Sequence, residues 1–179
     1  MGSPGYRRYG LEEWCGQGSD RPAGAAAGRV PDPAGGAVTE VKFYHNAPDR
    51  LRAACVITSK AVAQGHRLVV FAPDDTTARA YDEQLWTFQP GSFVPHVRAN
   101  SPLAARTPVL ITRSLTDLAC SDALLNLAPD LPPEFSSFGM LIEIVGQAEA
   151  DRAMARQRWR QYKALDLPVT AHDLGRSAS

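Results

Sequence analysis

The sequence has little cysteine and no long apolar run. Its 179 residues include three cysteines, Cys15, Cys55 and Cys120. An odd and widely spaced set predicts neither a disulfide framework nor a CxxC metal site, and it favours a reducing compartment. No apolar stretch approaches the ~18 residues that a membrane helix needs. The N-terminus also lacks the apolar segment of a secretory signal. We therefore expect a cytoplasmic protein that does not bind membranes.

An excess of one charge is also missing. The chain has 19 lysines and arginines and 19 aspartates and glutamates, which gives a formal net charge of zero. A balanced charge argues against broad, non-specific binding to DNA or to anionic membrane. It still allows a local basic patch.

The composition divides the chain into three parts. Glycine, alanine and proline dominate residues 1–39, which are predicted to be a disordered extension because they cannot bury enough apolar surface to offset their ordering entropy. Residues 40–167 have the length and composition of one globular domain. Residues 168–179 are predicted to be a C-terminal tail.

Apolar runs and helical patterns alternate through the domain. Strands are predicted at 41–44, 67–72, 108–112, 123–127 and 140–145. Helices are predicted at 46–65 with Asn46 as the N-cap, at 73–86 and at 147–165. Residues 87–107 are predicted to be a long irregular connection. This order predicts an α/β fold, a doubly wound and mostly parallel sheet with helices on both faces.

The expected fold is Rossmann-like but lacks a phosphate-binding loop. The first strand–helix turn, residues 45–49, has no glycine, and Pro48 removes a backbone donor. Neither GxxxxGK[ST] nor GxGxxG occurs in the sequence. We therefore expect no nucleotide cofactor. The alternative is a small enzyme or nucleotide-binding protein whose ligand lies at the carboxyl ends of the strands, near His45, Asp74 and Thr112.

No catalytic or metal-binding pattern is evident. None of the four histidines has a recognised metal-ligand spacing to another His, Cys or Asp, and no GxSxG nucleophile motif is present. Cys55 lies on the apolar face of the first predicted helix, which favours a buried structural thiol. His45 beside Asp49 fits an acid–base group, but a polar residue at a strand end is the simpler interpretation. The sequence thus predicts a protein without catalysis, cofactor or metal.

The last predicted helix carries a basic–aromatic stripe. It consists of Arg156, Trp159, Arg160 and Lys163, which the i, i+3, i+4, i+7 spacing places on one face. Met154, Tyr162 and Leu165 are expected to pack on the sheet from roughly the opposite face. The stripe suits a ligand with carboxylates and an apolar anchor. It equally suits a solvated cationic face that favours the helix dipole, and the spacing does not decide between the two.

Three segments resemble a known family. YDEQLW at 81–86 with SFVPH at 92–96 is similar to the LDEALW…SFVPH block of the chi subunit of bacterial DNA polymerase III holoenzyme. ARQRWRQY at 155–162 is similar to that family's ARERYKAY pattern, and Phe43-Tyr44 in the first strand also agrees. The resemblance covers residues 40–167.

The resemblance implies a non-catalytic adaptor that contacts DNA only indirectly. Such proteins bind the acidic, apolar-ended C-terminal tail of single-stranded-DNA-binding protein, and they pair with the psi subunit, which tethers them to the clamp loader. By matching position, the tail would contact Arg156, Trp159, Arg160 and Val145, with Lys163 peripheral. The psi interface would be Phe93 with Trp86 nearby, although Trp86 also fits a core position. Direct binding of single-stranded nucleic acid would need a longer aromatic groove than one helix provides.

Overall fold

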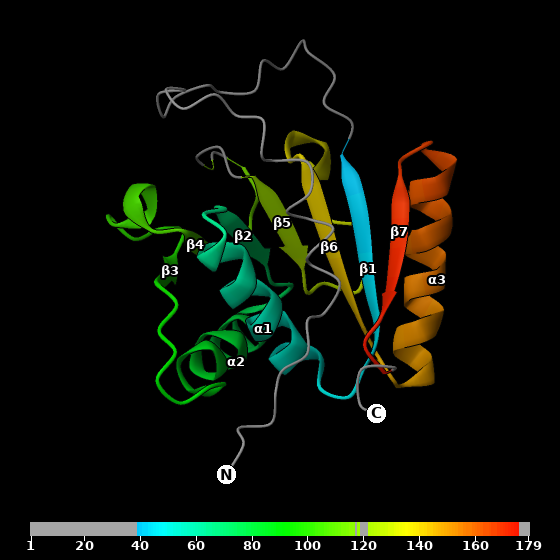
Figure 1. Cartoon of the computed structure of the whole chain (residues 1–179). Coiled ribbons are helices and arrows are strands. Elements are labelled where there is room, and N and C mark those ends of the chain that lie inside the picture. Colours follow the sequence, from blue (N-terminus) through cyan, green and yellow to red (C-terminus); the bar gives the residue numbers. More distant parts are fainter. Residues whose placement is uncertain (1–38, 117, 119–121, 176–179) are drawn as a thin grey trace.

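The computed structural model describes residues 39–116, 118 and 122–175. The predicted disordered extension, apart from Thr39, lies outside these residues. The described chain forms one seven-stranded sheet in the order β3-β4-β2-β5-β6-β1-β7 (Figure 1). All neighbouring strands are parallel, which confirms the predicted α/β class. The strands are β1 (Glu40–Ala47), β2 (Leu68–Phe71), β3 (His96–Arg98), β4 (Val109–Thr112), β5 (Ala123–Asn126), β6 (Met140–Gly146) and β7 (Val169–Asp173).

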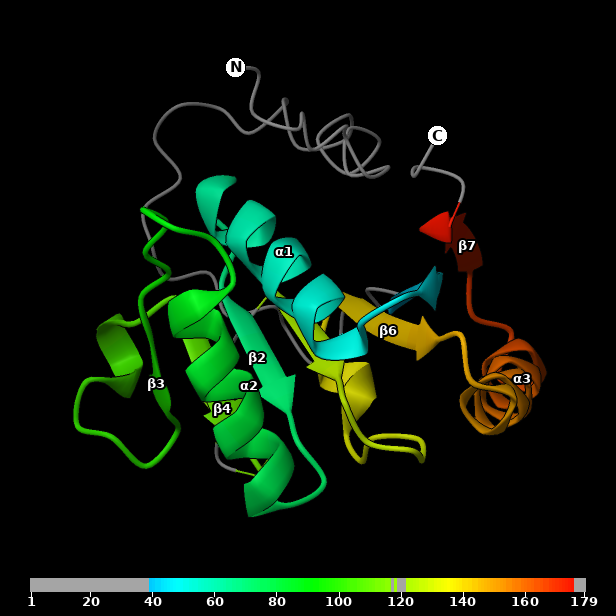
Figure 2. The ribbon, with the colours of Figure 1, turned by 90° about the horizontal axis from the view of Figure 1, so that it is seen from below.

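Helices cover both faces of the sheet. They are α1 (Arg50–Ala63), α2 (Asp75–Thr87) and α3 (Glu149–Ala164), with 3-10 turns η2 (Ala104–Arg106) and η3 (Phe135–Ser137). The core residues of α1 and α2 belong to one apolar cluster and those of α3 to another, on the opposite face. Figure 2 shows α3 well apart from α1 and α2. Among the described helices, none combines the length and apolar character needed to cross a membrane.

Local capping fixes where the helices begin and end. The side chain of Asp49 accepts a hydrogen bond from the Arg52 amide and caps α1. Asn46, the predicted cap, lies three residues earlier with φ 62°, so that prediction was wrong. Asp74 caps α2 through the amide of Thr77. Gly65 follows α1 with φ 84°, a left-handed conformation that favours glycine.

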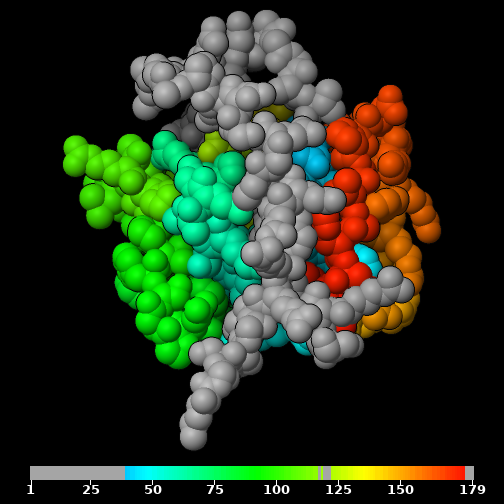
Figure 3. Space-filling view, in the orientation of Figure 1, coloured from blue at the N-terminus to red at the C-terminus, as the bar shows by residue number. Residues whose placement is uncertain are grey.

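Two edge strands were not predicted. β3 and η2 lie within residues 87–107, which were expected to be irregular throughout. β7 pairs with β1, so the sheet extends beyond the domain boundary expected at residue 167. Both strands are short and only partly buried, so neither has the continuous apolar run that reveals a central strand. Figure 3 shows β7 and α3 side by side at one edge of the molecule.

The face that α3 turns to the sheet differs from the expected one. Tyr162 is buried as predicted, but Met154 is 38% exposed and Leu165 is 55% exposed. The buried residues of α3 are instead Ala155, Arg158 and Tyr162. An arginine therefore occupies an inward position that the pattern assigned to apolar side chains.

The turn after α1 offers a test of the backbone. We expect Gly65→Ala to lower the free energy of unfolding by about 1 kcal/mol because an L side chain disfavours positive φ. No atom lies within 4 Å of the added Cβ, so the cost comes from the backbone alone. Urea unfolding measures it. The matched control is Gly139→Ala, whose Cβ would lie 3.6 Å from the Asp122 carbonyl at an ordinary φ. Equal stability of the two variants would contradict the assignment.

Candidate functional site

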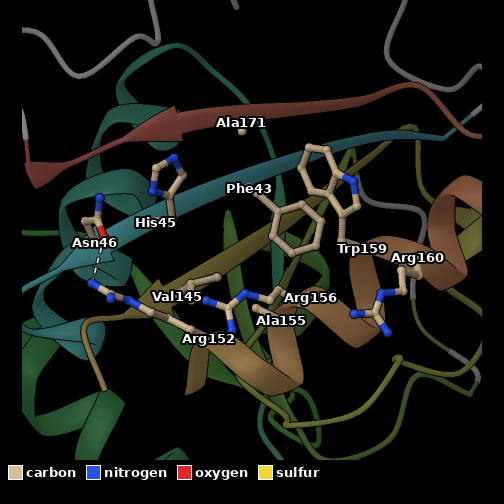
Figure 4. Close-up of a pocket in the computed structure, with 10 residues that line it drawn as sticks. All are labelled: Phe43, His45, Asn46, Val145, Arg152, Ala155, Arg156, Trp159, Arg160 and Ala171. Atoms are coloured by element: carbon tan, nitrogen blue, oxygen red, sulfur yellow. Dashed lines mark hydrogen bonds between the residues drawn. The ribbon is translucent and has the colours of Figure 1, made fainter. Parts of the chain in front are cut away.

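A pocket of about 520 Å³ lies between α3 and the β1, β6 and β7 strands. Phe43, Val145, Ala155 and Ala171 supply its apolar surface, and Trp159 stands beside Phe43 with ring centroids 5.1 Å apart (Figure 4). The wall formed by α3 is cationic. We call this the α3 pocket, and its lining residues are Phe43, His45, Asn46, Val145, Arg152, Ala155, Arg156, Trp159, Arg160 and Ala171.

The structure brings the predicted tail-binding residues together. Arg156, Trp159, Arg160 and Val145 all line the α3 pocket. Val145 comes from the end of β6 and the other three from α3, so residues distant in sequence share one cavity. Lys163 is not among the lining residues, and its Nζ lies 5.9 Å from the centre of the Trp159 ring. The stripe is thus divided between the pocket and its rim.

Sequence reasoning missed a third arginine and the polar end of the pocket. Arg152 lies one turn before Arg156, and the i, i−4 spacing was the signal that could have found it. Its Nη2 donates to Asn46 Oδ1 at 3.1 Å, and Asn46 Nδ2 donates to Asp173 Oδ1 at 2.8 Å. This chain links α3 to the ends of β1 and β7. Phe43 and His45 from β1, with Ala155 from α3 and Ala171 from β7, complete the missed residues.

An internal carboxylate already pairs with one pocket arginine. Arg156 Nη1 lies 2.7 Å from Glu149 Oε1, and both side chains are exposed. The hydrogen bond and charge of Arg156 lower the pKa of the Glu149 carboxyl. Arg156 therefore has the geometry to hold a carboxylate, and an anionic ligand would compete with Glu149 for it.

A second surface lies at the other edge of the sheet. Trp86 on α2 is 57% exposed and Phe93 is 66% exposed, with ring centroids 5.5 Å apart. The core alternative for Trp86 was therefore wrong. The ring of His96 in β3 packs edge-on to Trp86 at 5.1 Å, and its Nε2 lies 3.4 Å from Asp82 Oδ1. We call this the Trp86–Phe93 surface.

The residues named for the nucleotide alternative do not converge. His45 lines the α3 pocket, Asp74 caps α2, and the Thr112 hydroxyl donates to the Ser114 carbonyl. β5 and β6 separate β1, which carries His45, from β2, which leads to Asp74. Within the described residues, no cluster of three or more His, Cys, Asp or Glu side chains could hold a metal ion.

Open α/β sheets usually bind ligands at the carboxyl ends of their strands. Here an internal ion pair lies beside the carboxyl ends of β5 and β6. Arg50 donates to the Ile144 and Leu127 carbonyls at 3.0 and 2.9 Å, and its Nη1 lies 3.5 Å from Asp151. Asp151 also accepts the Gly146 amide at 2.6 Å. The Arg50–Asp151 pair thus ties the start of α1 to the start of α3 beside these strand ends.

These features define a class of protein: a doubly wound α/β domain without a glycine-rich phosphate loop, with a cationic pocket at one sheet edge and an aromatic surface near the other. The family model described as DNA polymerase III chi subunit, HolC, matches residues 38–170. The chain belongs to this family, whose members are components of the DNA polymerase that replicates bacterial DNA.

Curated relatives agree with the family. The chain is similar to DNA polymerase III subunit chi of Pseudomonas aeruginosa, with 29% identity over 78% of this chain and 99% of the relative. The subunit chi of Haemophilus influenzae is 26% identical over 68% of this chain and 85% of the relative. Among solved structures, the C-terminal domain of the DEAD-box protein Dbp5 aligns with a TM-score of 0.51 at 15% identity, over 77% of this chain and 91% of that one. That likeness shows a shared fold.

Cys55, predicted to be a buried structural thiol, offers a test of the packing of α1. It is fully buried in α1, and burial raises the pKa of its thiol to about 12. We expect Cys55 to stay unmodified by iodoacetamide at neutral pH in the native protein and to be alkylated in urea, because only the thiolate reacts. Mass spectrometry of digested peptides reads Cys55 separately from Cys15 and Cys120. Rapid native alkylation of Cys55 would overturn its structural role.

Proposed function

We propose that this protein is a non-catalytic adaptor of the replication machinery in the cytoplasm. The α3 pocket binds the acidic C-terminal tail of single-stranded-DNA-binding protein. The Trp86–Phe93 surface binds the psi subunit, which connects the protein to the clamp loader. DNA is contacted only through these partners.

The observation that carries the proposal is the composition of the α3 pocket. Arg152, Arg156 and Arg160 stand on successive turns of one helix beside an apolar floor that includes Phe43 and Trp159. Guanidinium groups pair with carboxylates through two parallel hydrogen bonds. An apolar floor next to them accommodates an apolar chain end, whereas a phosphate or sugar ligand would leave it unused. An acidic peptide with an apolar end matches both parts.

The separation of the two surfaces supports the adaptor role. The α3 pocket borders β7, the last strand at one edge of the sheet, and the Trp86–Phe93 surface borders β3, the last strand at the other. Two partners can therefore bind at once without sharing residues. The separation of His45 from Asp74 by two strands disfavours the nucleotide alternative.

Arginine variants test the tail site. A synthetic acidic peptide with an apolar C-terminal end should bind in the micromolar range by calorimetry. We expect Arg156→Ala and Arg160→Ala each to weaken binding about tenfold, the loss of a charge-assisted hydrogen bond. Added salt should weaken wild-type binding because exposed charges are screened. The matched control, Lys163→Ala, should change affinity less than about twofold. Full affinity in both arginine variants would sink the assignment.

A separate variant tests the tether. We expect Phe93→Ala to abolish co-purification with the psi subunit while peptide binding at the α3 pocket stays unchanged, because exposed aromatic anchors dominate interface energies. Leu103→Ala is the control, since Leu103 is also an exposed apolar residue. Retention of psi by Phe93→Ala together with Trp86→Ala would refute the placement of this interface.

A further inference from the structure

A buried polar cluster joins α3 to the sheet. Glu143 in β6 is 0% exposed and the Arg158 side chain is 2% exposed. Arg158 Nε donates to Glu143 Oε2 at 3.1 Å, and its Nη2 lies 3.0 Å from the same oxygen. Tyr162 donates its hydroxyl to Glu143 Oε1 at 2.7 Å, and Asn126 Nδ2 donates to that oxygen at 2.9 Å.

Every polar neighbour of the Glu143 carboxyl is a donor. Arg158 and the Asn126 amide nitrogen can only donate, and of these contacts only the Tyr162 hydroxyl could also accept a hydrogen from a protonated carboxyl. Burial raises the pKa of Glu143, while the Arg158 charge and the hydrogen bonds from Asn126 and Tyr162 oppose that rise. The donors, and above all the Arg158 charge, therefore favour an ionised carboxylate. Burial and the Glu143 charge also raise the pKa of Tyr162, which keeps its hydroxyl a donor.

The same cluster holds the loop after β5. Arg158 Nη1 donates to the Pro129 carbonyl. Asn126 Nδ2 also donates to the Asp130 carbonyl at 3.0 Å, and its Oδ1 accepts the Ala128 amide at 2.9 Å. Arg158 thus bonds both to strand β6 and to the loop after β5, and each hydrogen bond has a preferred direction.

Stability alone does not account for the ion pair. Apolar side chains of similar volume usually stabilise a core as well as a buried ion pair does, because desolvation offsets the attraction. The fully buried apolar contacts of α3 are few: Ala155 and Tyr162 are its other buried residues, and Trp159 is partly buried against the same cluster. Sparse packing leaves the rotation of a helix about its axis weakly fixed, whereas the guanidinium fork has directional bonds.

That rotation decides which side chains enter the α3 pocket. Successive residues of an α-helix are about 100° apart, so Trp159 lies about a quarter turn from Arg158. Arg156 and Arg160 lie further round, on the pocket side. Turning α3 by a fraction of this angle would move Trp159 away from Phe43. It would also move the arginines away from the apolar residues of the α3 pocket.

We infer that Glu143 and Arg158 are positioning residues of the α3 pocket: their buried contacts fix the rotation of α3 and so the geometry that an acidic peptide meets. This rests on the proposed function of the pocket. Neither residue contacts the ligand.

An apolar replacement of the cluster separates positioning from stability. The triple variant Glu143→Leu/Arg158→Met/Tyr162→Phe removes the charges and the hydroxyl that would lose its acceptor. We expect its thermal midpoint to equal or exceed that of the wild type. Its affinity for the acidic peptide should fall about tenfold in calorimetry. In a Trp14→Phe/Trp86→Phe background, the near-ultraviolet circular dichroism of Trp159 should weaken, because its contact with Phe43 is no longer fixed.

The controls keep each outcome decisive. Met154→Ala, an exposed change on α3, should leave all three measurements unchanged. Arg158→Lys keeps the positive charge but loses the planar guanidinium group, and we expect it to weaken peptide binding about threefold. If the triple variant does not fold, this variant tests the positioning role instead. A folded triple variant with wild-type affinity and dichroism would overturn the inference. Absence of peptide binding by the wild type would instead refute the proposed function, while the dichroism would still test the positioning role.

Discussion

The buried carboxylate of Glu143 is the constraint on which the rest of the site depends. It accepts hydrogen bonds from Arg158, Tyr162 and Asn126 inside the protein, and through Arg158 it ties α3 to β6. The same helix carries the arginines of the α3 pocket. One face of α3 therefore contacts Glu143 in the interior, and another face lines the cationic pocket. A helix whose buried residues are Ala155, Arg158 and Tyr162 gains a fixed orientation from such directional contacts.

The fold also bears on where a ligand can bind. A parallel sheet leaves a crevice at the carboxyl ends of its strands, and open α/β proteins place their ligands there. In this chain Arg50 bonds the carbonyls that border the crevice, and Asp151 accepts the Gly146 amide. The α3 pocket lies beside the ends of β1, β6 and β7 at one edge of the sheet, and the Trp86–Phe93 surface lies near the other edge. The likeness to Dbp5 shows a shared fold only.

Much of this structure could be predicted from the sequence. The central strands are continuous apolar runs, and spacing placed Arg156, Trp159 and Arg160 on one side of a helix. The edge strands β3 and β7 were missed because they are short and half exposed. Arg158 could not be told from its neighbours by residue type, since four arginines lie within nine residues. The available signal was Glu143, an acid in the middle of the apolar strand Leu-Ile-Glu-Ile-Val, which needs a buried partner.

The central claim is that the α3 pocket receives an acidic peptide with an apolar end. The most direct test is a titration of isotope-labelled protein with such a peptide, followed by nuclear magnetic resonance of the backbone amides and the indole N–H groups. The account predicts the largest shifts at Trp159, at the arginines of α3 and at the strand ends that carry Asn46, Val145 and Ala171. Shifts confined to the Trp86–Phe93 surface or to the crevice beside Arg50, or no shifts at saturating peptide, would contradict it.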